Sequence, residues 1–202
     1  MRPHAWLAGC LLLLAQFAQA QATPTAIVKA ARQQVGVTRS YDPAYVRLAY
    51  PNGDVPADRG VCSDVVVRAY RKIGVDFQKL LHQDMAAHFK DYPALWGLSR
   101  PDSKIDHRRV PNLRRYLERQ GKAVAVTDRS TDYLPGDIVS WRLPNGLAHV
   151  GIVSDRKVGF GLLGRPLVIH NIGYGAQEED VLFSWQQTGH YRWISERGVA
   201  AR

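Results

Sequence analysis

The sequence places one cysteine where a thiol could act as a nucleophile. Segment 60–64, Gly-Val-Cys-Ser-Asp, puts Cys62 just after a glycine turn and in the first turn of an apolar helix. Free backbone N–H groups and the positive end of the helix dipole stabilise a thiolate there, and can lower its pKa from ~8.5 to roughly 3.5–7.5. The same N–H groups could hold the oxyanion of an acyl-transfer intermediate. The alternative is a cysteine that only packs under the helix.

A nucleophilic thiol needs a base, and the sequence offers a histidine on a strand. His149 lies in Ala-His-Val-Gly-Ile-Val at 148–153, and Gly151 shares its face and leaves room beside it. The next strand ends with His170 and Asn171, either of which could orient the imidazole through its second nitrogen. Because a strand alternates its side chains, these two face opposite ways, and we favour His170. Taken alone, a strand histidine is more often structural than catalytic.

A charged segment, Asp-His-Arg-Arg at 106–109, is the main candidate for substrate binding. Arg108 and Arg109 could hold a substrate carboxylate through bidentate hydrogen bonds. The alternative is a solvated charge cluster in front of a helix. Asp106 and His107 side by side suggest metal ligation, but no second pair has ligand spacing. We therefore expect neither a metal nor a cofactor.

A carboxylate also lies two residues after the thiol. Asp64 could bind a substrate amine, or form a buried ion pair with Arg59 or Arg68.

The elements that must position these residues are helices first and strands second. Hydrophobic spacing and capping residues predict the helices, and the period changes to two after residue 122. Pro144-Asn145-Gly146 predicts an antiparallel hairpin, so the fold class is α+β. The expected helices cover 23–36, 62–73, 76–85 and 111–121, and the expected strands cover 123–126, 137–143, 148–154, 167–172 and 190–194.

A long loop is expected between the first two helices, over 37–60, where turn residues dominate. Loops of this length often build sites. Tyr50 is a candidate substrate-binding residue in it, and Tyr41 and Asp54 could also line the cleft or add an oxyanion donor. Tyr and Asp in turns are otherwise structural.

The first 20 residues have the pattern of a secretory signal: a basic start, an apolar run and Ala18-Gln19-Ala20. We expect cleavage near Ala20, no stable membrane anchor, and a periplasmic or secreted protein. Leu7-Ala8-Gly9-Cys10 imitates a lipoprotein box, but most of the apolar run follows this cysteine rather than preceding it. Cleavage would leave Cys62 as the sole cysteine of one domain, residues 21–202, with a helical insertion around 76–122.

The composition is that of a globular protein with a basic surface. Of 202 residues 46% are hydrophobic and 22% charged, which argues against a disordered chain. The net charge of +9 suggests a polyanionic neighbour. Nucleic acid is not favoured, because the basic residues are spread along the chain without a zinc-finger or aromatic RNA-binding signature. Peptidoglycan or another anionic envelope polymer fits this charge. Nothing in the sequence indicates the oligomeric state.

The motifs together resemble a known superfamily. A cysteine at a helix start, then Gly-Asp-Ile-Val, then Ala-His-Val-Gly-Ile-Val, then a polar residue on the next strand is similar to the NlpC-like cysteine peptidases of bacterial cell walls. Tyr-Pro-Asn-Gly-Asp-Val-Pro, Gly-Val-Cys-Ser-Asp-Val-Val-Val-Arg-Ala-Tyr-Arg, Gln83-Asp84-Met85 and Ile-Asp-His-Arg-Arg-Val-Pro-Asn-Leu resemble an exported bacterial family of unknown function, the YijF-like proteins.

This resemblance implies a papain-like α+β fold with Cys62 as nucleophile, His149 as base and His170 as the orienting residue. Two features depart from the NlpC-like pattern, which has Gly where this chain has Asp64 and lacks the insertion at 76–122. The expected function is hydrolysis of an amide in peptidoglycan stem peptides, as an endopeptidase or amidase, through a Cys62 acyl-enzyme. The alternatives are a non-catalytic envelope-binding module, and a Cys-dependent transferase, deamidase or antibacterial wall-degrading toxin.

Overall fold

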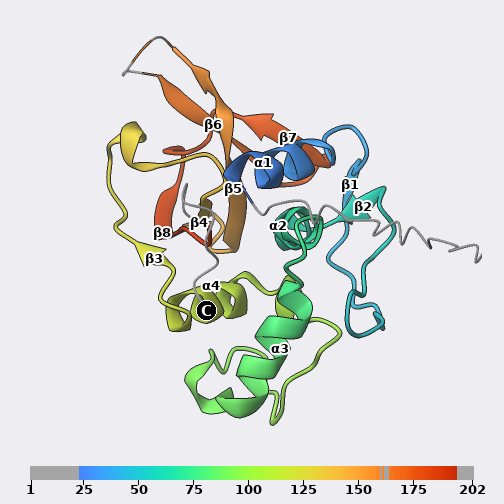
Figure 1. Ribbon diagram of the computed structural model, residues 1–202. Helices are drawn as coiled ribbons and strands as arrows, with labels where there is room; N and C mark the ends of the chain where they lie inside the picture. Colours follow the sequence, from blue (N-terminus) through green and yellow to red (C-terminus); the bar gives the residue numbers. More distant parts are fainter. Residues whose placement is uncertain (1–22, 160, 162–163, 195–202) are drawn as a thin grey trace, which may run out of the picture.

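The part of the chain that the structure describes folds as four α-helices against a six-stranded antiparallel sheet (Figure 1). A computed structural model describes residues 23–159, 161 and 164–194. The sheet has the strand order β3-β8-β4-β5-β6-β7, and all its neighbouring strands are antiparallel. The predicted α+β class is confirmed. The predicted signal segment lies outside the described residues.

The first and the third helix each begin after a residue whose side chain caps the helix. Thr23 accepts a hydrogen bond from the Ala26 N–H and Asp76 accepts one from Gln78, so each satisfies a backbone donor that a helix start leaves free. The α-helices are α1 (Pro24–Arg32), α2 (Cys62–Arg71), α3 (Phe77–Ala87) and α4 (Val110–Arg119). Short 3-10 turns are η1 (Phe89–Asp91), η2 (Asp106–Arg108) and η3 (Ser130–Asp132).

The strands follow the predicted order, with one addition to the main sheet. The hairpin at Pro144-Asn145-Gly146 joins β4 and β5, and pairs Trp141 with His149. The unpredicted β7 has the sequence Ala-Gln-Glu-Glu, which carries no hydrophobic alternation. The main sheet consists of β3 (Ala123–Val124), β4 (Ile138–Arg142), β5 (Ala148–Val158), β6 (Arg165–Asn171), β7 (Ala176–Glu179) and β8 (Gln186–Tyr191).

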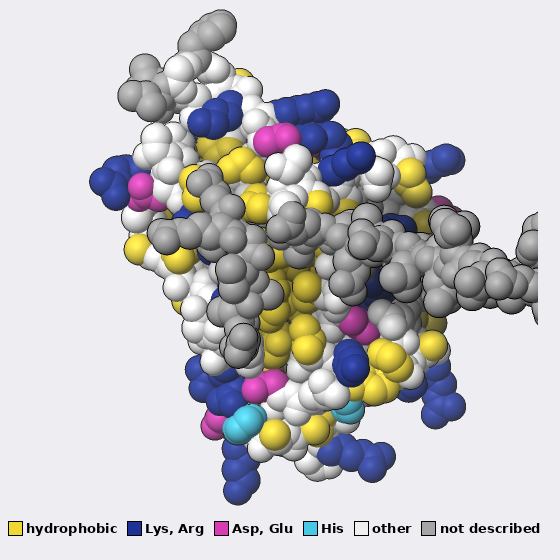
Figure 2. Space-filling view, in the orientation of Figure 1, with side chains coloured by type: hydrophobic (Ala, Val, Ile, Leu, Met, Phe, Trp, Pro, Cys, Tyr) yellow, Lys and Arg dark blue, Asp and Glu magenta, His cyan; other side chains and the backbone are white. Residues whose placement is uncertain are grey.

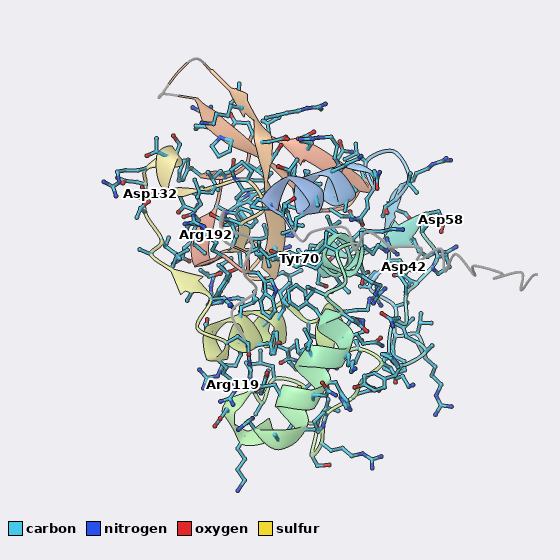
Figure 3. The ribbon with its side chains drawn as sticks, viewed as in Figure 1. Asp42, Asp58, Tyr70, Arg119, Asp132 and Arg192 are labelled. Atoms are coloured by element: carbon cyan, nitrogen blue, oxygen red, sulfur yellow. The ribbon has the colours of Figure 1, made fainter. Side chains whose placement is uncertain are left out.

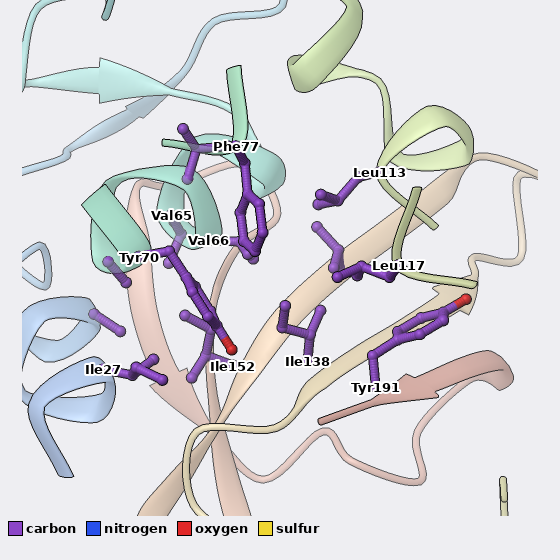
Figure 4. Close-up of a cluster of buried hydrophobic side chains, with 14 of the residues drawn as sticks. Ile27, Val65, Val66, Tyr70, Phe77, Leu113, Leu117, Ile138, Ile152 and Tyr191 are labelled. Atoms are coloured by element: carbon purple, nitrogen blue, oxygen red, sulfur yellow. The ribbon is translucent and has the colours of Figure 1, made fainter. Parts of the chain in front are cut away.

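The two faces of the sheet have different environments. Val150 and Ile152 of β5 point toward the helices, where they join a large apolar cluster with α2 and α4 (Figure 4). Val153 and Trp141 belong to a smaller cluster on the other face, which residues outside the helices complete. His149 and Gly151 share this second face by strand alternation. His149 therefore lies on one side of β5, and Val150 and Ile152, which pack against the helices, lie on the other.

The loop between α1 and α2 carries two short parallel strands, β1 (Ser40–Tyr41) and β2 (Arg59–Gly60). Arg68 of α2 holds this loop by an ion pair with Asp54 and by hydrogen bonds to the Val55 and Arg59 carbonyls. Asp42 and Asp58 lie in this region, on one side of α2 (Figure 3). The loop therefore has a fixed path that brings β1 beside the start of α2.

On the face of the molecule that Figure 2 shows, Lys and Arg side chains are distributed rather than gathered in one patch. Among the helices of residues 23–159, 161 and 164–194, none combines the length and apolar character that crossing a bilayer requires.

Candidate functional site

Cys62 occupies the first turn of α2, as the sequence predicts, but its environment differs from the expectation. The side chain is 2% exposed, and burial raises the pKa of the thiol to about 11. The backbone N–H of Val150 and the hydroxyl of Tyr41 act in the opposite direction, and the nearby charge of Asp64 adds to the rise. The predicted low pKa is therefore wrong for the free protein. Loss of water around the sulfur outweighs the helix dipole.

Tyr41 is the residue of the long loop that reaches the thiol. Its hydroxyl interacts with Cys62, and burial, followed by the influence of that thiol, raises the pKa of Tyr41. The phenol is thus a protonated donor at neutral pH, next to the atom that would attack a carbonyl. Asn171 helps to hold Tyr41 here, since its amide donates to the carbonyls of Ser40 and Gly60. Asn171 ties the loop and the start of α2 to β6.

His149 and His170 meet on the face of the sheet that does not pack against the helices. Nε2 of His149 lies 2.9 Å from Nδ1 of His170, and the two rings are nearly perpendicular at 81°. Trp141 and Trp185 pack around the His149 ring, and burial lowers its pKa to about 3, with His170 contributing further. Both imidazoles are neutral at neutral pH, since burial also lowers the pKa of His170. The structure places His170, and not Asn171, beside the base.

The absence of a side chain at Gly151 permits this approach. A Cβ at Gly151 would lie 2.6 Å from Val168 Cγ1, 3.0 Å from the Ile169 carbonyl oxygen and 3.1 Å from His170 Cβ. Such distances are shorter than van der Waals contact. β6 can therefore carry His170 close to β5 only because residue 151 is a glycine.

Glu179 is a further charged group that the sequence does not indicate. Its Oε2 lies 3.0 Å from Nε2 of His170, so a carboxylate ends the row formed by the two histidines. The residue belongs to β7, the strand that hydrophobic periodicity does not predict. Glu178 and Glu179 are adjacent in the sequence, and only the pairing of β7 with β6 shows which of them lies on the same side of the sheet as His170.

The backbone of β5 separates the thiol from the ring of the candidate base. Val150, whose N–H acts on the sulfur, directly follows His149 in the chain. Among the described residues, no hydrogen bond joins the sulfur to the His149 ring. Cys62 and His149 instead line two neighbouring cavities that share Tyr41, Leu147 and Ala148. The two functional groups therefore face neighbouring cavities with a common wall.

Asp64 and Arg108 form an internal ion pair, so the expected partners Arg59 and Arg68 are wrong. The Arg108 guanidinium makes three hydrogen bonds to the Asp64 carboxylate, of 3.0 to 3.2 Å, and the two side chains are 3% and 5% exposed. Asp64 also accepts from the Val61 N–H at 2.7 Å. Arg108 donates to the carbonyls of Asp42 and Ala44 in the long loop. With these partners the pair fixes the start of α2, and neither charge is free for a substrate.

Arg109, unlike Arg108, has no buried carboxylate bound by three hydrogen bonds, and it stays a candidate for substrate binding. It lies in the wall of the cavity that contains Cys62, which has a volume of about 870 Å³. Its guanidinium is held 3.0 Å from Asp106 Oδ1 and lies 4.2 Å from the ring centre of Trp96. Arg114 and Arg142 line the same cavity, and no Asp or Glu is among the described residues of its wall. The cavity therefore favours an anionic ligand.

Tyr50 does not reach this region. Its ring contacts His82 of α3, with ring centres 5.1 Å apart, and it lines neither of the two cavities. Asp54 forms an ion pair with Arg68, in which Oδ2 lies 2.9 Å from Nε. The prediction that these two loop residues line the cleft is wrong, because α3 and α2 hold them away from it. Within the described part of the chain, no three His, Cys, Asp or Glu side chains gather as a metal site.

The chain is similar to known proteins in its fold and in its sequence. An NLP/P60 family protein from Staphylococcus aureus, described as similar to a lipoprotein, aligns with 89% of this chain at a TM-score of 0.41 and 12% identity. The chain spans 45% of that protein, and similarity at this level assigns no activity. YijF of Escherichia coli K12, described as uncharacterized, is 62% identical over 172 residues, which are 85% of this chain and 82% of YijF. The family model described as domain of unknown function DUF1287 matches residues 28–193, and the chain belongs to this family.

Proposed function

We propose that this protein is an exported cysteine hydrolase that cleaves an amide bond in peptidoglycan stem peptides. One observation carries the proposal: Cys62, in the first turn of α2, lines a cavity of about 870 Å³ beside β5, whose His149 pairs with His170 of β6. A cavity of this size accommodates a short peptide segment. A thiol, an imidazole and an orienting group are the components of acyl transfer by cysteine.

The chemistry starts from a neutral thiol rather than a thiolate. In the proposed reaction the Cys62 sulfur attacks the amide carbonyl while His149 accepts the thiol proton. The carbonyl π electrons move to the oxygen, which the Tyr41 hydroxyl and the N–H groups at the start of α2 can stabilise. The C–N bond then breaks as the imidazolium returns a proton to the leaving amine. Water then attacks the thioester carbonyl as His149 accepts its proton, the C–S bond breaks to release the carboxylic acid, and the imidazolium returns the proton to the sulfur.

The charge of the cavity supports a substrate with free carboxylates. Arg109 is held rigid by Asp106 and Trp96, and Arg142 and Arg114 extend the positive wall. Preorganised guanidinium groups recognise carboxylates by bidentate hydrogen bonds. Stem peptides bear such groups. The signal-like pattern of residues 1–20 supports export to the compartment that contains this polymer.

The test compares the mature protein, residues 21–202, with two variants on purified peptidoglycan. Cys62→Ala removes the nucleophile, and His88→Gln serves as a control because it removes an exposed imidazole outside the site. Soluble fragments are identified by mass spectrometry, and their masses report the cleaved bond. We expect fragments from the mature protein and the control but none from Cys62→Ala. Absence of fragments from the mature protein, or equal release by Cys62→Ala, would overturn the proposal.

A further inference from the structure

The row of side chains behind the candidate base ends at a carboxylate on the surface. Oε2 of Glu179 lies 3.0 Å from Nε2 of His170, although the approach does not reach regular hydrogen-bond geometry. The His170 side chain is 0% exposed and that of Glu179 is 44% exposed. The Glu179 carboxylate thus lies next to His170, on the side of that ring away from His149.

Strand pairing makes this contact specific to one of two adjacent glutamates. β7 pairs with β6 so that Val168 faces Glu179 and His170 faces Gln177, which puts Glu179 on the same side of the sheet as His170. Glu178 points to the other side, where it pairs with Arg32 at 2.8 Å. Glu178 stabilises the contact between α1 and the sheet, and Glu179 is the one that faces the histidines.

The carboxylate of Glu179 favours one assignment of the ring protons on His170 and His149. A carboxylate oxygen 3.0 Å from an unprotonated nitrogen would oppose two lone pairs, so Nε2 of His170 carries the proton. In a neutral imidazole the other nitrogen, Nδ1, is then an acceptor. Nδ1 of His170 lies 2.9 Å from Nε2 of His149, so His149 donates from Nε2. Its own Nδ1 keeps a lone pair.

We propose that Glu179 is a positioning residue that selects the tautomer of His149 through His170, and so leaves Nδ1 of His149 free to accept a proton from a thiol. The catalytic use of this selection rests on the proposed function. When the thiol proton moves to Nδ1, Nε2 of His149 keeps its own proton and its bond to His170. No proton reaches Glu179, whose charge stabilises the imidazolium at a distance.

The test reads the tautomers directly, without a substrate. The mature protein is labelled with ¹⁵N in its histidines, and the ring nitrogen shifts are measured in the wild type, Glu179→Ala, Glu179→Gln and Asp180→Asn. Asp180→Asn is the matched control, because it removes a negative charge one residue away that pairs with Arg165. We expect protonated Nε2 on both histidines in the wild type and the control. Glu179→Ala should mix the tautomers, and Glu179→Gln, which keeps an acceptor oxygen, should restore part of the selection.

Two results would overturn the inference. One is a proton on Nδ1 of His149 in the wild type, and the other is identical histidine shifts in the wild type and Glu179→Ala. If stem peptides are cleaved, Glu179→Ala should lower kcat roughly tenfold with KM unchanged, as expected for an outer partner of a functional histidine. If the tautomers are as expected and no stem peptide is cleaved, the proposed function fails while the selection by Glu179 stands.

Discussion

Separating Asp64 from Arg108 should destabilise the protein more than any surface change. The pair is almost fully buried, with three hydrogen bonds between the side chains. Arg108→Met retains the apolar stem of the side chain and removes the guanidinium. The Asp64 carboxylate would then stay buried with only the Val61 N–H among its present partners, and the carbonyls of Asp42 and Ala44 would lose their donor.

The expected loss follows from the cost of an unpaired charge. Removing one partner of a buried ion pair typically costs about 3–5 kcal/mol, whereas replacing both partners costs far less. Domains of this size lose roughly 2–4 °C in Tm for each kcal/mol, so Arg108→Met should lower Tm by roughly 6–20 °C. Because native proteins are stable by only about 5–15 kcal/mol, this is a large share of the total.

Urea unfolding of Asp64→Asn, Arg108→Met and the double variant measures the coupling between the two side chains. We expect the double variant to be more stable than the sum of the single losses predicts, by roughly 2 kcal/mol or more. Arg165→Met is the matched control, since its pair with Asp180 is exposed and should contribute little. Additive single losses, or an Arg108→Met loss equal to that of the control, would refute the view that this pair fixes the start of α2.

Three further predictions concern the thiol, the base and the glycine beside them. Because burial raises the pKa of Cys62 to about 11, alkylation of Cys62 by iodoacetamide should accelerate about tenfold per pH unit between pH 7 and 10; a rate that is already constant below pH 8 would contradict this. Burial lowers the pKa of His149 to about 3, so its contribution to stability is complete above pH 6.5 and decreases by up to about 4 kcal/mol as the pH falls toward 3. The stability of His149→Gln, measured by urea unfolding from pH 7 to 4, should therefore fall less steeply than that of the wild type, and equal slopes would argue against it. Gly151→Ala should cost about 1–3 kcal/mol in thermal unfolding because its Cβ would overlap Val168 and the Ile169 carbonyl, while Gly173→Ala, where a Cβ meets nothing within 4 Å, should cost little; similar losses would refute the packing account.

The sequence determined those features that depend on local chemistry. Hydrophobic periodicity predicts the four helices of the described residues, because a helix buries one face, and capping residues mark the starts of α1 and α3. The position of Cys62 in the first turn of α2 follows in the same way from Gly60 and the apolar run behind it. Strand alternation also places His170 and Asn171 on opposite faces, since the side-chain period of a strand is fixed by backbone geometry.

Tertiary structure decided everything that depends on which neighbours a side chain meets. The thiol pKa is raised rather than lowered because the fold removes water from Cys62, and no local pattern reports this burial. Asp64 pairs with Arg108, 44 residues away, rather than with the nearer Arg59 or Arg68. Glu179 reaches His170 only through the register of β6 and β7, in a strand too polar and too short to be predicted. Partners far apart in the sequence meet only when strand order and register are fixed, and those depend on the packing of the whole sheet.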